Sequence, residues 1–120
     1  MAVLVITNAW AVLDARLAAS AASREATRSA VESEVDPHAT AVRAGHRTLD
    51  AFGYGAADSS IDIAAPNGFG RCAPVTTTVS IRVPALRLPW VTGVGEVTVS
   101  AHHREVVDPY RNDVPEGGCP

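Results

Sequence analysis

The first 13 residues form an almost unbroken apolar run, in which Thr7 and Asn8 are the only polar residues. Neither glycine nor proline occurs before Pro37, and alanine, the strongest helix former, recurs throughout this stretch. The pattern therefore predicts one long helix over residues 3–34.

The apolar run is too short to cross a membrane unaided. As a helix it rises roughly 20 Å, whereas a bilayer core is about 30 Å thick. The run also lacks the basic leader and the small-residue cleavage site of a secretory signal peptide. Two hypotheses stay open: a core helix of a soluble protein, or the downstream part of a membrane helix that begins upstream of Met1.

Small side chains recur along one side of the predicted helix, every three or four residues. This alanine stripe consists of Ala15, Ala18, Ala19, Ala22, Ala26 and Ala30. Such a stripe lets another helix approach closely, although an alanine-rich sequence also produces it by chance. If the stripe mediates assembly, Ala22→Leu or Ala26→Leu should impair assembly and leave the sheet folded. Charged residues give the helix a solvated flank, on which we expect Glu25 to pair with Arg28.

A second, shorter helix follows a break at Asp36-Pro37, because proline lacks an amide hydrogen and disfavours helical geometry at the preceding residue. Its apolar face is spaced by three, four and three residues, and Gly53-Tyr54-Gly55 supplies the stop. The residues of this face are Val42, Gly45, Leu49 and Phe52. We expect the face to pack on a sheet.

From residue 58 onward the apolar period changes from 3.6 to 2. Alternation over residues 61–65, 75–83 and 97–102 predicts strands with one wet face. Pro84 and Pro89 restrict ladder pairing between the last two strands. We therefore predict an α+β fold, with a long N-terminal helix (residues 1–36) and a small domain (residues 37–120). In this domain the second helix packs on three or four antiparallel strands.

Composition and spacing argue against several function classes. The chain has no lysine and a formal net charge of -3, so it offers no basic stripe to nucleic acid. His38 and His46 are eight residues apart, and the neighbours His102 and His103 point to opposite faces of a strand, so no histidine pair has metal-ligand spacing. No nucleophile elbow or phosphate-binding loop occurs. We expect no catalytic residue, metal, cofactor or small-molecule substrate.

Two cysteines, Cys72 and Cys119, match no zinc spacing. They form either one long-range disulfide or two free thiols. The disulfide would place the sheet outside the cytoplasm, since such bonds persist in oxidising compartments.

Several segments, in order along the chain, resemble the actinobacterial TadE-like proteins, pseudopilin-like components associated with the Tad (tight adherence) pilus assembly system. Residues 8–16 and 21–28 look like that family's helix leaving the membrane. Gly68-Phe69-Gly70-Arg71-Cys72, the strand from 75 to 83, and Val107 to Arg111 resemble the family's later segments. The matching positions are Arg71, Cys72, Pro84, Pro89, Trp90, Asp108, Pro109, Tyr110 and Arg111.

The resemblance implies a pilin-like, non-catalytic subunit, anchored by one N-terminal pass in the cytoplasmic membrane, with its C-terminal domain outside the cytoplasm. Its partners would be other pilin-like subunits or pilus assembly proteins. Family members begin with a charged leader, a processing region and a full hydrophobic span, so we expect the true start to lie upstream of Met1. The alternative is a soluble or peripheral adaptor that binds a partner protein through its exposed apolar helix.

Overall fold

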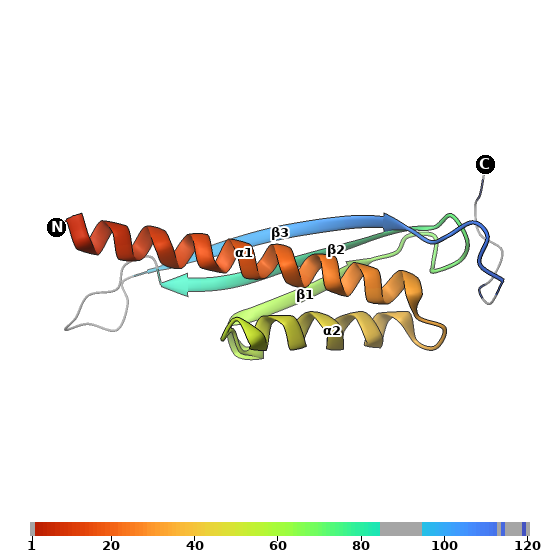
Figure 1. Ribbon diagram of the computed structural model, residues 1–120, viewed down its shortest axis with the longest axis horizontal. Helices are drawn as coiled ribbons and strands as arrows, with labels where there is room; N and C mark the ends of the chain where they lie inside the picture. The colour runs from red at the N-terminus through yellow and green to blue at the C-terminus, as the bar shows by residue number, and fades with distance from the viewer. Residues whose placement is uncertain (1, 85–94, 113, 115–118, 120) are drawn as a thin grey trace.

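The computed structural model describes residues 2–84, 95–112, 114 and 119. It has an α+β fold in which two helices cover one face of a three-stranded antiparallel sheet of order β1-β2-β3 (Figure 1). The helices are α1 (Ala2–Glu32) and α2 (Pro37–Ala51), and a 3-10 turn, η1 (Ala56–Asp58), precedes the sheet. The strands are β1 (Ser59–Ala64), β2 (Pro74–Pro84) and β3 (Glu96–Val106). The predicted fold class is confirmed.

The helix boundaries follow the local sequence signals. Asp36 takes a left-handed backbone conformation, with φ of 46°, and its side chain accepts a hydrogen bond from the Ala39 amide at 3.1 Å. This N-cap and the proline that follows it begin α2. At the other end, Gly53 has φ of 87°, and the Gly53 and Tyr54 amides donate to the carbonyls of Asp50 and Leu49. This is a Schellman motif, and it confirms the expected stop.

The sheet alternates as its sequence predicts. Along β2, Val75, Thr77, Val79, Ile81 and Val83 are buried against the helices. The residues between them lie on the open face, where Ser80 and Ser100 hydroxyls are 2.9 Å apart across the strand pair. Residues 85–88, the segment that would supply a fourth strand, lie outside the described residues.

The core contains α1 as well as the sheet domain. Ala15, Ala18, Ala19 and Ala22 pack in one cluster with Leu49 and the middle of β2, while Ala26 and Ala30 join a second cluster around Val75 and Val107. From Ala15 onward, α1 therefore belongs to the same packed unit as α2 and the sheet. The core therefore contains residues from both sides of position 36, the boundary expected between the long helix and the small domain.

The second helix packs differently from our expectation. Its buried residues are Ala41, Ala44, Gly45 and Leu49, whereas Phe52 is 42% exposed and caps the helix end. A Cβ added at Gly45 would lie 3.5 Å from the Ala26 methyl and 2.5 Å from Ile61 Cδ1. Because position 45 has no side chain, α2 can lie close to both α1 and β1. The prediction that Phe52 belongs to the core face was wrong. Helix α2 packs on α1 as well as on the sheet.

Candidate assembly surface

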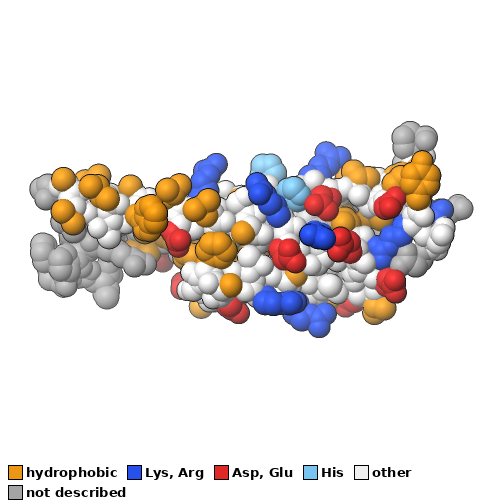
Figure 2. Space-filling view, viewed as in Figure 1, with side chains coloured by type: hydrophobic (Ala, Val, Ile, Leu, Met, Phe, Trp, Pro, Cys, Tyr) orange, Lys and Arg blue, Asp and Glu red, His pale blue; other side chains and the backbone are white. Residues whose placement is uncertain are grey.

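The N-terminal part of α1 carries large apolar side chains that the rest of the fold leaves exposed. Val3, Ile6 and Trp10 are 75%, 67% and 69% exposed, and among the described side chains of the helix the first that is fully buried is Ala15. Figure 2 shows hydrophobic side chains gathered at this end of the molecule. In Figure 1 the same segment extends beyond α2 and β1. Exposed apolar surface of this extent marks an interaction site.

Five of these side chains form a regular outer stripe on α1. They are Val3, Ile6, Trp10, Leu13 and Leu17, separated by three, four, three and four residues, and each is at least half exposed. This is the spacing by which one helix packs along another. At about 100° per residue, the outer stripe lies on the opposite side of α1 from the alanine stripe. The spacing is present in the sequence, but it does not stand out there because other apolar residues, such as Val5 and Val12, lie between its members.

The alanine stripe lies inside the fold. Its six members, from Ala15 to Ala30, are between 0% and 1% exposed. Helix α1 uses them to approach the second helix and the sheet of its own chain, so they cannot contact another subunit in this fold. Leucine at position 22 or 26 would therefore strain the core of its own chain rather than a contact with another subunit.

The charged flank of α1 also differs in detail from our expectation. Arg28 Nε lies 3.1 Å from Glu32 Oε1, one turn further along, rather than pairing with Glu25. The hydrogen bond and the charge of Glu32 raise the pKa of Arg28, and the more distant charge of Glu25 acts in the same direction. Both partners are well exposed, so the pair adds little to stability.

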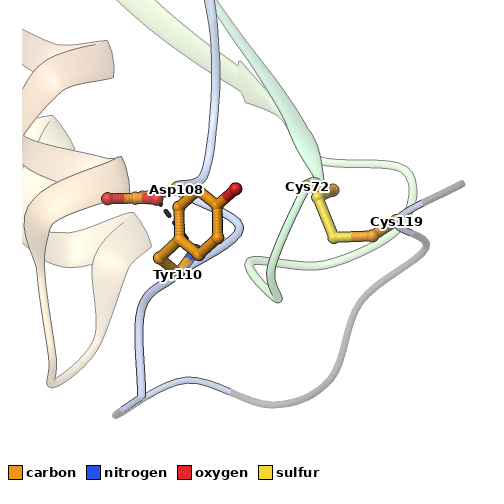
Figure 3. The surroundings of a disulfide bond; sticks show 4 residues. All are labelled: Cys72, Asp108, Tyr110 and Cys119. Carbon is orange, nitrogen blue, oxygen red and sulfur yellow. Dashed lines mark hydrogen bonds between the residues drawn. A yellow bond between two sulfur atoms is a disulfide. The ribbon is translucent and has the colours of Figure 1, made fainter.

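At the opposite end of the molecule, Cys72 and Cys119 form a disulfide, with their Cα atoms 5.0 Å apart (Figure 3). Of the two alternatives, one long-range disulfide or two free thiols, the structure therefore supports the disulfide. Cys72 lies in a turn joined to the end of β3, since its amide donates to the Val107 carbonyl at 2.9 Å. The bond therefore fastens the C-terminal tail to the turn before β2.

The segment after β3 fastens the end of α1. The Arg111 guanidinium donates to the Val31 carbonyl and, at 2.7 Å, to the Glu32 carbonyl, the last residues of the helix. An arginine here neutralises carbonyls that have no partner within the helix. Asp108 Oδ1 accepts from the Tyr110 amide at 2.9 Å and shapes the turn that presents Arg111 (Figure 3). This role of Arg111 was not predicted from the sequence.

The other family-like positions have separate places in the fold. Pro84 ends β2, Arg71 lies half-buried in the turn before Cys72, and Pro109 lies exposed beside Asp108. Pro89 and Trp90 lie outside the described residues. These positions form no single cluster with the outer stripe, which is at the far end of the molecule.

The neighbours His102 and His103 point to opposite faces of β3, as their spacing predicts. His102 is on the open face of β3, whereas His103 faces α1 and its Nε2 is 3.0 Å from Glu105 Oε1. The Thr27 hydroxyl of α1 contacts the His103 carbonyl at 3.2 Å. Within the described residues, no three histidine, cysteine or acidic side chains converge in a way that could hold a metal ion.

No helix among the described residues has a stretch long and apolar enough to cross a bilayer. Comparison with protein-family models, curated proteins and solved structures finds no match to this chain.

Proposed function

We propose that this chain is a non-catalytic, pseudopilin-like subunit of a Tad-type pilus or a related secretion assembly. The N-terminal part of α1 anchors it at the cytoplasmic membrane and packs against other subunits or assembly proteins. The small α+β domain lies outside the cytoplasm. The TadE-like resemblance of the ordered sequence segments suggests the family, and the outer stripe of α1 is the observation that carries the proposal.

The outer stripe suits packing between helices. Its side chains are large, it runs for four turns from Val3 to Leu17, and its own chain leaves it exposed. Taken together, the five side chains expose on the order of 500 Å², so a symmetric contact would bury about 1,000 Å² in total, the lower bound for a specific interface. A second helix with the same spacing would seat its side chains between them.

The disulfide supports an extracytoplasmic place for the domain. A bond between Cys72 and Cys119 persists in oxidising compartments, and it lies at the end of the molecule opposite the outer stripe. An anchor at one end and an oxidised domain at the other fit a subunit that stands on the outer surface of the membrane.

Membrane fractionation tests the anchor. We expect the chain to stay in the membrane pellet after a high-salt wash, because salt screens charge but does not weaken apolar burial. Release by the wash would contradict the proposal and favour the adaptor hypothesis.

A matched pair of variants tests the assembly role. Ile6→Ala/Leu13→Ala truncates the outer stripe, while Val5→Ala/Val12→Ala removes exposed apolar side chains away from it. Neither variant introduces a charge into residues 2–13 of α1, which carry none, so both should stay in the membrane pellet. Sedimentation of detergent-solubilised membranes should show large complexes for the second variant and their loss for the first. Equal complex formation by the two would contradict a role for the stripe.

A further inference from the structure

A small cavity lies where the exposed part of α1 meets the turn after α2. Its volume is about 400 Å³, and its lining includes Trp10 and Asp14 from α1 and Phe52 and Tyr54 from the turn. The chain has two tryptophans, two tyrosines and two phenylalanines, so half of its aromatic side chains line this one cavity. Tyr54 also packs against the core, whereas Trp10 and Phe52 are 69% and 42% exposed.

The cavity also carries a negative charge. Asp14 Oδ2 accepts a hydrogen bond from the Tyr54 hydroxyl at 2.7 Å, which fixes the carboxylate beside the aromatic rings. Among the described residues, neither the Arg28–Glu32 ion pair nor the His103–Glu105 contact includes Asp14. Aromatic faces attract cations through the ring quadrupole, and a carboxylate adds a full negative charge that also attracts cations.

The aromatic walls of the turn are held in place before any ligand arrives. The Schellman motif at the end of α2 fixes the backbone from Phe52 to Tyr54, and Gly53 supplies the left-handed residue that this motif needs. The Tyr54–Asp14 hydrogen bond then joins the turn to α1. A preformed site loses little freedom on binding.

We propose that this cavity binds a trimethylammonium group, as carried by choline and by choline lipid headgroups. Such a group combines a positive charge with an apolar methyl surface and has no N–H donors to satisfy. It therefore matches a site made of three aromatic side chains and one carboxylate. This inference goes beyond the assembly function. It concerns the unassembled chain, because Trp10 also belongs to the outer stripe that packs against other subunits in the proposed assembly.

Fluorescence titration tests the proposal on the full chain. The Trp90→Phe variant leaves Trp10 as the only tryptophan, so its emission reports on the cavity. We expect choline to change this emission saturably, and 3,3-dimethylbutan-1-ol, its neutral analogue of the same shape, to bind roughly tenfold more weakly. Equal binding of the two compounds, or no saturable change with choline or with choline lipids, would overturn the proposal.

The charge is tested by Asp14→Asn, which keeps an oxygen that can accept from Tyr54. It should weaken choline binding roughly tenfold and leave the binding of the neutral alcohol unchanged. Asp50→Asn, an exposed carboxylate outside the cavity lining, is the matched control and should bind choline like the parent protein. Equal choline binding by the two variants would contradict a role for the Asp14 charge.

Vesicles distinguish the two sources of the ligand. A change in Trp10 emission that depends on Asp14 and occurs with phosphatidylcholine but not phosphatidylglycerol vesicles supports the headgroup. The same change with free choline alone supports a soluble ligand. Because Asp14→Asn should stay in the membrane pellet like the parent chain, failure of choline binding and failure of membrane anchoring can be told apart.

Discussion

The disulfide offers a quantitative test of how the small domain is stabilised. Cys119 is exposed, so Cys119→Ser removes the bond with little other change. The two cysteines are 47 residues apart. In the chain-entropy model, closing a loop of this length lowers the conformational entropy of the unfolded chain and so raises the free energy of unfolding by about 4 kcal/mol. Because a domain of this size has a total stability of about 5–15 kcal/mol, the variant should lose a large part of it.

Urea denaturation followed by circular dichroism measures this loss. With a slope of about 2 kcal/mol per molar urea, the midpoint of Cys119→Ser should fall by about 2 M. A reducing agent should move the wild-type midpoint to that of the variant and leave the variant unchanged, which serves as the internal control. A difference below about 1 kcal/mol under oxidising conditions would refute the reasoning.

Three further substitutions test the packing and the caps by the same denaturation assay. Ala22→Leu should lower the free energy of unfolding by about 1–3 kcal/mol, because Ala22 is fully buried. As a control, Ala9→Leu on the exposed helix surface should change it by less than about 0.5 kcal/mol. Equal effects of the two substitutions would contradict the assigned core. Thr77→Val should raise stability by about 1 kcal/mol, because the Thr77 hydroxyl is buried and has no hydrogen-bond partner among the described residues. A loss would show that this hydroxyl is satisfied. Arg111→Gln should cost about 1 kcal/mol by uncapping α1, and a value near zero would contradict the cap.

The local signals in the sequence were sufficient for most of the fold. Asp36-Pro37 predicts the break between the helices, since the aspartate caps α2 and the proline occupies its first turn. The change of apolar period near residue 58 predicts the strands, because alternating positions of β2 face the helices and the open side in turn. These features depend on residues close together in the chain.

Features that depend on tertiary contacts could not be predicted in the same way. The alanine stripe predicts close helix packing, but nothing in its spacing tells whether the partner belongs to the same chain or to another. Phe52 has the spacing of the core face, yet the Schellman turn at Gly53 carries the chain away from the core there. Arg111 reaches the end of α1 only because the sheet returns the chain to it, about 80 residues later.

In the proposed assembly, the outer stripe of α1 contacts another protein subunit. A photo-crosslinking amino acid placed at Leu13, on the stripe, tests it most directly, with the same probe at exposed Arg43 of α2 as the control. The account predicts that the probe at Leu13 forms a crosslinked protein adduct in membranes while the probe at Arg43 does not. Absence of an adduct at Leu13, or equal adducts at both positions, would contradict it.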